Sequence, residues 1–372
     1  MSTRSKLTYS LFLCVATLLL LALVEGATRT IVLARTGEWP VTALLAEYRD
    51  NRTVHGLFRR HPWLNVSGKG SSRAEVQGKI FTLNSAGYRS PERSFEKPAG
   101  VLRVLCAGGS TTFDSLTDRN ETSWPWRLEE ELRARGLSVE VWNAGLPTWT
   151  TLENIIALLT RDVELRPDLL VMMQGFNDLQ PASHDPHDPT YERGHAGRML
   201  SALGFELDEP GLLDRSIALE RLRALLGRSP SRAEADIATL APAVSEAGLT
   251  TYRRNLRTVI AVARAHGIEV VLVTQPLRQA PVETPRDRRF LTEWLGIEGD
   301  AVEDELAKVN RILLEVAAQE GAMAVDAVGE TSWQREDFWD PVHFATAGSD
   351  KLARLLAGRL APLLREEEAD PG

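Results

Sequence analysis

The sequence predicts an α/β fold in which helices cover both faces of a mainly parallel β-sheet. Two observations lead to this prediction. From about residue 101 onward, short apolar segments rich in aliphatic and β-branched residues alternate with amphipathic segments of helical length. The short segments are apolar at nearly every position, which is typical of strands that are buried on both faces. Right-handed connections between parallel strands then place helices on the two faces of the sheet.

Each predicted element has its own local signals. The first strand, 101–109, ends in two glycines, and the helix that follows is closed by Gly136 as a C-cap. The second helix, 150–167, has Thr151 as its expected N-cap. The remaining strands are expected at 138–145, 168–175, 268–276 and 322–329, and the remaining helices at 123–136, 251–267, 303–321 and 346–368.

The chain divides into a lead-in, one large domain with two insertions, and a short tail. Residues 28–100 mix helical and extended signals, and we expect them to pack on the domain rather than to fold separately. The domain spans 101–365 and carries a long insertion at about 178–248. A second insertion runs from 276 to about 300. The acidic tail, 366–372, is predicted to be disordered.

Residues 1–27 have the pattern of a signal anchor or a signal peptide. Arg4 and Lys6 precede an uncharged apolar run, 7–24, which Glu25 ends. The run is just long enough to cross a bilayer as a helix. The positive start favours a cytoplasmic N-terminus and an extracytoplasmic location for the rest of the chain. Because no small-x-small cleavage site is obvious, we favour retention as a single membrane span over cleavage to a secreted or periplasmic form.

Composition and charge exclude several classes of function. The formal net charge is −8 and the basic residues are scattered, so we expect no nucleic-acid partner. Cys14 lies in the apolar run and Cys106 in a buried strand, so we expect no disulfide between them. A His-Asp-Pro-His-Asp cluster at 184–188 could bind a metal ion. We interpret it as a solvated loop, and we expect no metal and no cofactor.

Three polar motifs follow the first three strands, at the edge of the sheet where α/β folds form their sites. After the first strand, the sequence Gly-Gly-Ser-Thr-Thr-Phe-Asp at 108–114 would expose the Ser110 hydroxyl at a strand-to-helix turn, as a serine nucleophile requires. After the second, Gly145 can present its backbone N–H to a neighbouring site. After the third, Asn177 carries an amide that can donate to an oxyanion. Taken alone, each motif also fits an ordinary loop, turn or helix cap.

A fourth motif, Asp-Pro-Val-His, lies close to the C-terminus. Asp340 and His343 are three residues apart, and Pro341 restricts the loop between them. At this spacing the carboxylate can support the back of the imidazole while the ring faces the site. His343 would then take the Ser110 proton as general base and return it to the leaving group. A surface histidine in a loop is the alternative, and the three other motifs argue against it.

Together the four motifs resemble those of the SGNH hydrolases, also called GDSL esterases and lipases. The order Ser, Gly, Asn and Asp-x-x-His is that of the family, the resemblance covers about 101–365, and 84–92 is similar to the lead-in of some bacterial members. The resemblance implies a flavodoxin-like three-layer α/β/α fold. One departure is Gly109, which stands where the family name has Asp and so removes a polar side chain beside the nucleophile.

The resemblance also implies a role for each motif residue. Ser110, His343 and Asp340 would form a catalytic triad. The backbone N–H groups of Ser110 and Gly145 and the side chain of Asn177 would form the oxyanion hole. This set of residues needs neither a metal nor a cofactor for acyl transfer.

The predicted activity is hydrolysis of an O-acyl ester through an acyl-enzyme on Ser110. An extracytoplasmic enzyme tethered to the membrane is expected to act on acetylated glycans, lipid esters or other envelope esters. Two alternatives stay open: O-acyl transfer to an alcohol in polysaccharide modification, and a catalytically silent binding module that keeps the fold.

Aromatic residues near the first two motifs could stack on sugar rings, but we interpret them as packing residues. These residues are Trp124, Trp126, Trp142 and Trp149.

Overall fold

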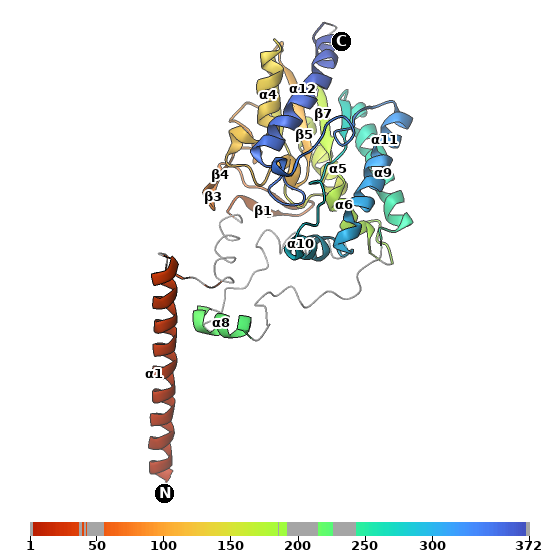
Figure 1. Ribbon diagram of the computed structural model, residues 1–372. Coiled ribbons are helices and arrows are strands. Elements are labelled where there is room, and N and C mark those ends of the chain that lie inside the picture. Colours follow the sequence, from red (N-terminus) through yellow and green to blue (C-terminus); the bar gives the residue numbers. More distant parts are fainter. Residues whose placement is uncertain are drawn as a thin grey trace. The chain divides into compact units, whose positions relative to one another are not determined.

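The computed structural model divides the chain into two compact units (Figure 1). One unit comprises Met1–Arg52 and Glu206–Asp236, and the other comprises Thr53–Phe205 and Ile237–Gly372. The structure describes residues 3–36, 39–40, 42, 56–184, 186–191, 215–225 and 243–369. The larger unit contains every predicted site residue.

A five-stranded parallel sheet forms the centre of the larger unit, which confirms the predicted fold class. The strand order is β6-β5-β7-β8-β9, and every neighbouring pair is parallel. The strands are β5 (Leu102–Gly108), β6 (Val139–Asn143), β7 (Leu169–Met173), β8 (Glu269–Val273) and β9 (Met323–Val325). The order reverses at β5, between β6 on one side and β7 on the other. In doubly wound sheets, ligands bind at the carboxyl ends of the strands at such a reversal.

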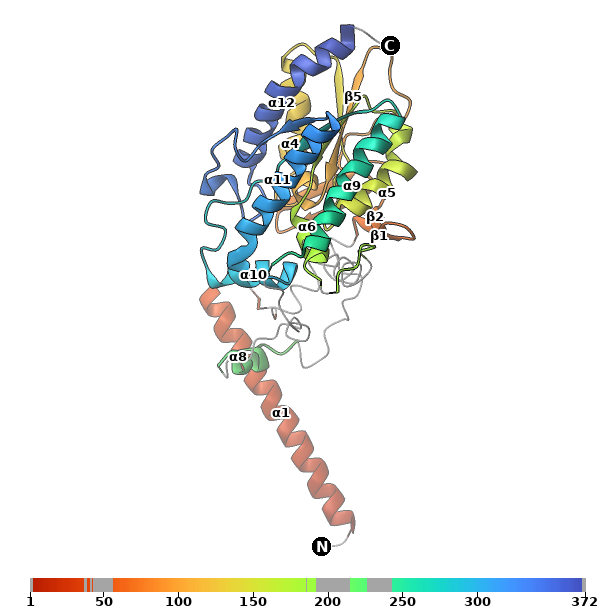
Figure 2. The same cartoon turned by 90° about the vertical axis from the view of Figure 1, so that its right-hand side faces the viewer.

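The side chains of β5 alternate between two apolar cores, one on each face of the sheet. Val104 and Cys106 belong to the core that α4 and α12 cover, whereas Leu105 and Ala107 belong to the core that α5, α9 and α11 cover. The helices are α4 (Trp124–Ala134), α5 (Thr151–Thr160), α9 (Glu246–Ala265), α11 (Val302–Glu320) and α12 (Thr346–Ala369). Figure 2 shows the two helical layers with the sheet between them. Full burial of a Val or Leu contributes about 1.5–3 kcal/mol, so these two cores stabilise the sheet from both sides.

The N-cap of α5 is Thr150, and the prediction of Thr151 is wrong by one residue. The Thr150 side chain accepts the N–H of Leu152, and the Glu153 carboxylate accepts the N–H of Thr150 at 2.8 Å, which completes a capping box. Thr151 instead donates its hydroxyl to Asp178 at 2.5 Å. Either threonine could cap the helix locally, and the contact with Asp178 engages the second one.

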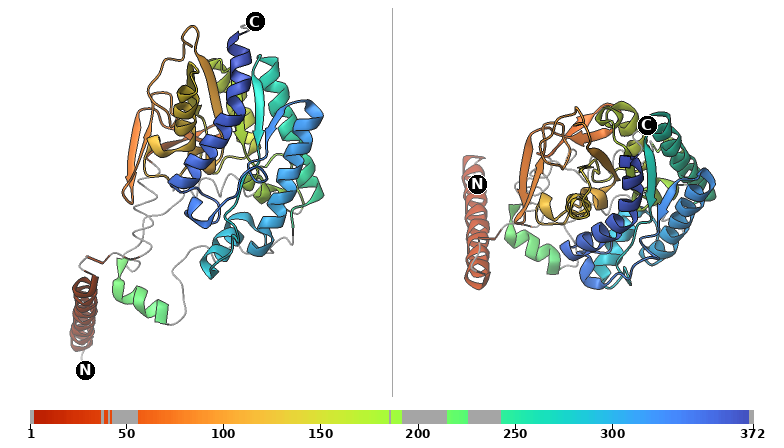
Figure 3. Two further views of the ribbon diagram at one scale, coloured as in Figure 1. Left: turned by 45° about the horizontal axis from the view of Figure 1, so that its top comes forward. Right: turned by 90° about the horizontal axis from the view of Figure 1, so that it is seen from above.

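Two antiparallel β-hairpins precede the sheet, and Figure 3 shows them beside it in orange. The first pairs β1 (Phe58–His61) with β2 (Asn65–Gly68), and the second pairs β3 (Ser72–Val76) with β4 (Lys79–Leu83). Their apolar side chains share a third core with residues that follow the first two motif-bearing strands. This core includes Val66, Phe81, Phe113, Leu146 and Trp149. The hairpins therefore pack directly on the loops that carry the site.

The two insertions add short helices, which are α6 (Phe176–Ala182), α8 (Ile217–Leu225) and α10 (Pro285–Leu295). In the predicted His-Asp cluster, Asp185 lies outside the described residues. His184 is 2.7 Å from Gln180 Nε2, and His187 is 2.8 Å from the Thr251 hydroxyl. Within the described ranges, no group of three or more His, Cys, Asp or Glu side chains could hold a metal ion.

The smaller unit is built on α1 (Thr3–Thr36). Among the described residues it is the one helix long and apolar enough to cross a membrane, over Thr8–Arg35. Length and composition of this kind are consistent with a signal anchor or a signal peptide. Cys14 lies exposed on this helix and Cys106 lies buried in β5, and both are free thiols.

A carboxylate of α1 caps the helix α8, which belongs to the long insertion. Glu25 accepts the hydroxyl of Ser216 at 2.8 Å and the backbone N–H groups of Ile217 and Ala218 at 2.9 and 3.0 Å. Arg29 of α1 pairs with Glu25 at 2.7 Å. The unpaired N–H groups at the start of a helix favour such an anion. The contact therefore joins the first residue after the apolar run to the insertion.

Candidate active site

Ser110 lies at the turn between β5 and the short helix α3 (Ser110–Phe113). A Cβ on Gly108, the last residue of β5, would lie 2.4 Å from the Met173 carbonyl oxygen, so glycine is needed for this close approach to β7. Ser110 is the first residue of α3, where backbone N–H groups lack an acceptor within the helix. The two glycines thus place the hydroxyl and the N–H of the same serine at the carboxyl edge of the sheet.

The three predicted triad residues form one hydrogen-bonded chain. His343 Nε2 is 2.8 Å from Ser110 Oγ, and His343 Nδ1 is 2.8 Å from Asp340 Oδ2. The other oxygen of Asp340 accepts the backbone N–H groups of Val342 and His343, both at 2.8 Å. The loop therefore holds the carboxylate against the back of the ring and directs Nε2 at the serine. The three-residue spacing predicts the contact between His343 and Asp340. Only the fold brings together Ser110 and His343, which are 233 residues apart.

The triad shifts the pKa values of its two ionisable members in the directions that a general base needs. Burial disfavours the carboxylate of Asp340, but the charge and hydrogen bonds of His343 outweigh burial and lower the pKa of Asp340 to about 2. Burial also disfavours the charged imidazolium of His343, but the charge and hydrogen bond of Asp340 raise its pKa above the ordinary 6.5. Asp340 is therefore ionised at neutral pH, and its charge can stabilise an imidazolium at His343.

Gly145 packs directly on the nucleophile helix. A Cβ at this position would lie 2.4 Å from the backbone nitrogen of Phe113 and 2.7 Å from the carbonyl carbon of Thr112. The N–H of Gly145 donates to the Asn143 side chain at 3.1 Å. The structure thus brings Gly145 to the turn that carries Ser110, with its N–H already engaged. An oxyanion at this place would compete with Asn143 for that donor.

The amide of Asn177, in the first turn of α6, lies beside the nucleophile turn. Its Nδ2 donates to the Trp149 carbonyl at 2.8 Å, and its Oδ1 accepts the indole N–H of Trp294 at 3.4 Å. These bonds orient the nitrogen toward Gly109, where a Cβ would lie only 2.5 Å from Nδ2. An amide nitrogen carries two hydrogens. One of them is engaged by Trp149, and the second can serve an oxyanion on Ser110.

The departure from the family motif at Gly109 has a steric reason. A Cβ at Gly109 would lie 2.5 Å from Asn177 Nδ2 and 3.2 Å from the Trp149 carbonyl oxygen. Gln174, buried at the end of β7, points to the same place: its Oε1 would be 3.3 Å from that Cβ, and its Nε2 donates to the Trp149 carbonyl. Two side-chain amides therefore occupy the space beside the nucleophile that an aspartate at 109 would need.

A buried polar cluster lies at the other end of α3, and no local sequence pattern indicates it. Asp114 accepts the Ser349 hydroxyl at 2.6 Å and the Trp124 N–H at 2.8 Å. Arg89 donates to the carbonyl oxygens of Phe113 and Asp114 at 2.7 and 2.5 Å. Burial raises the pKa of Asp114 to about 7. The cluster fixes the end of the nucleophile helix to α4, α12 and the segment before β5.

Trp294 and Gln174 are the contacts around Asn177 that sequence reasoning missed. Gln174 directly follows β7, so its position after a central strand is a signal that could have identified it. Trp294 comes from α10 in the second insertion, and no local pattern relates it to Asn177. The interpretation of the tryptophans near the first two motifs as packing residues is confirmed for three of them. Trp124, Trp142 and Trp149 are fully buried, whereas Trp126 is partly exposed.

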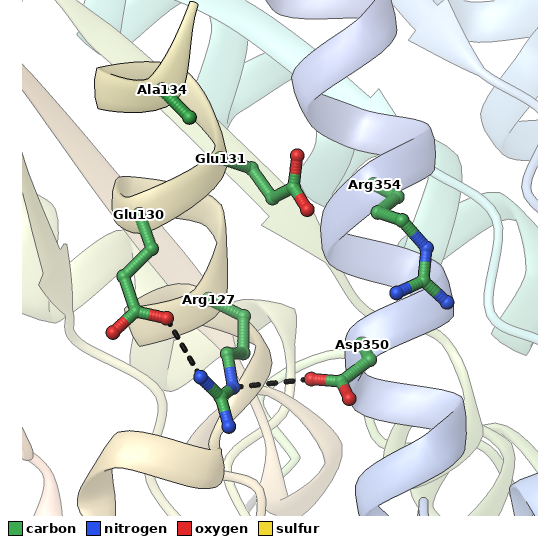
Figure 4. A pocket seen from close by; sticks show the side chains of 6 residues that line it. All are labelled: Arg127, Glu130, Glu131, Ala134, Asp350 and Arg354. Carbon is green, nitrogen blue, oxygen red and sulfur yellow. Dashed lines mark hydrogen bonds and ion pairs between the residues drawn. The ribbon is translucent and has the colours of Figure 1, made fainter.

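Figure 4 shows a surface pocket between α4 and α12, whose lining includes none of the proposed triad residues. It is lined by Arg127, Glu130, Glu131, Ala134, Asp350 and Arg354. Arg127 pairs with Glu130 at 2.7 Å and with Asp350 at 3.1 Å. The first pair lies within α4, and the second joins α4 to α12, so we assign the pocket a structural role.

Comparison with known proteins places the chain in a family of ester hydrolases. The chain is similar to a lipase/acylhydrolase from Enterococcus faecalis (17% identity, 70% of this chain and 96% of that chain, TM-score 0.42). It is also similar to an acetylxylan esterase from Geobacillus stearothermophilus (16%, 70% and 94%, TM-score 0.40). No curated protein matches. The GDSL-like Lipase/Acylhydrolase family matches residues 106–351, from within β5 to within α12. Since this match covers more than half of the sequence, the chain belongs to the GDSL-like lipase/acylhydrolase family, the SGNH hydrolases, and is an enzyme that acts on ester bonds.

Proposed function

We propose that the protein is a serine esterase that hydrolyses an O-acyl ester through an acyl-enzyme on Ser110. The observation that carries this proposal is the chain of two 2.8 Å contacts from Ser110 through His343 to Asp340. Acetylated glycans, lipid esters and other envelope esters are the substrate classes that fit an enzyme with an apolar N-terminal helix. The intact geometry of the triad supports an active enzyme over a silent binding module.

The proposed reaction has two halves that use the same residues. In the first half, Ser110 Oγ attacks the ester carbonyl carbon while His343 Nε2 accepts the hydroxyl proton. The N–H of Ser110, the amide of Asn177 and the N–H of Gly145, which must release Asn143 to do so, stabilise the negative charge on the carbonyl oxygen. The bond to the alcohol oxygen then breaks, and His343 returns the proton to that oxygen. In the second half, water attacks the acyl-enzyme with His343 as base, which releases the acid and restores the serine.

A fluorophosphonate probe tests the triad in the full chain in detergent. The wild type should be labelled and should hydrolyse p-nitrophenyl acetate, and Ser110→Ala and His343→Ala should lose both activities. Ser138→Ala and His266→Ala are matched controls, because both of these side chains are exposed outside the site. Labelling that survives in Ser110→Ala would place the nucleophile elsewhere. A folded wild type that is neither labelled nor hydrolytic would favour a silent module.

The same preparation distinguishes hydrolysis from acyl transfer. An esterase releases free acetate at a rate that added alcohol does not change. An O-acyltransferase would release less acetate in the presence of an acceptor sugar and would form the acylated sugar instead. Quantifying both products with and without the acceptor therefore decides between the two activities.

We also propose that α1 is retained as a single membrane anchor, with the larger unit outside the cytoplasm. Cleavage after residue 26 or 27 would separate α8 from Glu25, whose carboxylate caps it. Extraction of cell membranes with sodium carbonate should leave the full-length chain in the membrane fraction, with an intact N-terminus by mass spectrometry. A soluble form that begins near residue 28 would instead establish a cleaved signal peptide.

A further inference from the structure

Trp339 directly precedes the triad aspartate. In the triad loop, residues 338–344, it is the one residue whose large aromatic side chain is open to solvent. Its exposed fraction is 57%. Its backbone N–H donates to the His343 carbonyl at 2.9 Å, and a bridge between Phe338 and Phe344 closes the loop on its other side. The backbone of Trp339 is thus hydrogen-bonded directly to the backbone of His343, the proposed general base. A tryptophan placed in this way stands at a defined position relative to the reacting serine.

The side chain of Lys79 holds the indole from one side. Its ammonium lies 4.4 Å from the centroid of the Trp339 ring, within the range of a cation–π contact. The same ammonium donates to the Leu116 carbonyl at 2.6 Å and to Asp118 at 3.3 Å. Three segments therefore meet here: the triad loop, the β3–β4 hairpin and the loop after α3. Lys79 covers one side of the ring, and Trp339 as a whole is still 57% exposed, so the free surface of the indole faces solvent.

The chemistry of this place selects among the ester classes that the proposed function allows. A flat indole surface binds the C–H face of a sugar ring, and the Asp118 carboxylate, which is bonded to the Lys79 ammonium, can accept the ring hydroxyls. An acyl chain would cover the same charges without bonding them, which costs free energy. A ring that is already ordered by Lys79 loses little side-chain freedom on binding.

We propose that Trp339 and Lys79 form a subsite for the sugar ring that carries the ester, so that the substrate is an O-acylated glycan. This proposal rests on the proposed esterase function and specifies the alcohol half of its substrate. The sugar would stack on the free surface of the Trp339 indole while its ester group lies at Ser110. The subsite acts on binding, so its loss should raise KM more than it lowers kcat.

Two acetate esters separate recognition of the ring from the chemistry of the acyl group. Glucose penta-acetate presents a sugar ring, whereas glycerol triacetate presents an acyclic polyol with the same acyl group. In the full chain in detergent, Trp339→Ala should lower the ratio of kcat/KM for the ring ester over the acyclic ester by about tenfold, the upper end of an aromatic contact. Trp339→Phe should retain most of this ratio, and Lys79→Met should lower it by a smaller factor.

Trp63→Ala is the matched control, because this indole is 67% exposed in the turn between β1 and β2. It should leave the ratio at the wild-type value. A Trp339→Ala variant that keeps the wild-type ratio would overturn the subsite. An equal loss on both esters would also overturn it, since the indole would then only support the loop. If the wild type hydrolyses neither ester and takes no fluorophosphonate label, the esterase proposal itself fails. If it is labelled and shows no preference for the ring, the subsite proposal alone fails.

Discussion

At the scale of single residues, the proposed mechanism depends on how His343 and Asp340 affect each other. The carboxylate lies 2.8 Å from Nδ1 and raises the pKa of the imidazole. Below that pKa the ring is protonated and cannot accept the Ser110 proton. The pKa of Asp340 is lowered to about 2, so the carboxylate stays ionised across the working range. Of these two groups, only the histidine should therefore titrate on the acidic limb of the activity.

The first prediction concerns this limb. The kcat/KM for p-nitrophenyl acetate should rise with pH and reach half of its maximum above pH 6.5, because the neutral ring is the active form. Asp340→Asn removes the charge that raises the pKa of His343, so the limb should move to lower pH. The same change should lower kcat/KM by about 10⁴-fold, through loss of ring orientation. If the acidic limb of the pH profile stays in place in Asp340→Asn, a group other than His343 controls that limb.

The second prediction concerns Asn177. Asn177→Ala removes one donor from the proposed oxyanion hole and should lower kcat by about 10²–10³-fold with little change in KM. Trp294→Phe removes the indole bond to Asn177 Oδ1 and keeps the Asn177 amide, so it should have a much smaller effect on kcat. Steady-state kinetics on p-nitrophenyl acetate measures both. An unchanged kcat in Asn177→Ala would exclude its amide from the oxyanion hole.

The third prediction concerns Gly109. A Cβ there would lie 2.5 Å from Asn177 Nδ2, so Gly109→Ala should displace that amide and lower kcat in the same direction as Asn177→Ala. Gly358→Ala in α12 is the control, because a Cβ there meets nothing within 4 Å. The double variant Gly109→Ala with Asn177→Ala should be little worse than either single variant, since both changes act on one group. Additive losses would show that Gly109 acts independently of Asn177.

At the scale of elements, the short helix α3 is held at both ends by contacts from distant parts of the chain. Its start is fixed by β5, and its end by Asp114, which adopts a left-handed backbone conformation with φ 65°. The carboxylate of Asp114 joins the first residue of α4 to Ser349 in α12. A helix of four residues has little stability of its own, so these contacts determine where the nucleophile lies.

The fourth prediction concerns this carboxylate. Asp114→Ala leaves the Trp124 N–H and the Ser349 hydroxyl without their acceptor and should lower the free energy of unfolding by about 1–3 kcal/mol. Asp114→Asn keeps one acceptor oxygen and tolerates the left-handed conformation, so it should cost less. Urea denaturation followed by tryptophan fluorescence measures both values. Equal losses in the two variants would argue against the hydrogen bonds as the cause.

At the scale of the whole molecule, the chain contains one unit with a hydrolase fold and one with an apolar helix. The long insertion leaves the larger unit after α6, supplies α8 to the smaller unit, and returns to the larger unit before α9. The two units are therefore joined by three passages of the chain. The contact between Glu25 and α8 makes the segment after the apolar run part of a folded unit.

The fifth prediction concerns this contact. Glu25→Ala removes the acceptor for Ser216, Ile217 and Ala218, so α8 should open more often in the full chain in detergent. Trypsin should then cleave faster after Arg221 and Arg223 than in the wild type, as mass spectrometry of the fragments would report. Glu121→Ala, a change at an exposed carboxylate of the larger unit, should leave these rates unchanged. Equal rates in Glu25→Ala and the wild type would show that the carboxylate does not stabilise α8.

Local pattern was sufficient to predict the sheet strands and the long helices from residue 101 onward, and the strand ends that carry the motifs. The apolar runs of β5 and β7 and the periodicity of α9 and α11 are properties of contiguous residues, and the structure has these elements where they were expected. The spacing of Asp340 and His343 is local in the same sense, and their 2.8 Å contact was predicted from it. The N-cap of α5 was missed by one residue because two adjacent threonines are locally equivalent.

The sequence by itself determined the α/β class, the family motifs and the chemistry proposed for the triad, because strand burial, helix periodicity and a three-residue spacing are read along the chain. Only the tertiary structure decided which residues surround that chemistry. Gly109 is explained by Asn177 and Gln174, and Trp339 gains its place from Lys79. These partners are separated by many residues, and side chains of the same type elsewhere in the chain would give the same local signal. Packing of the two helical layers on the sheet selects among them, because close contacts form only where the folded backbone brings complementary groups together.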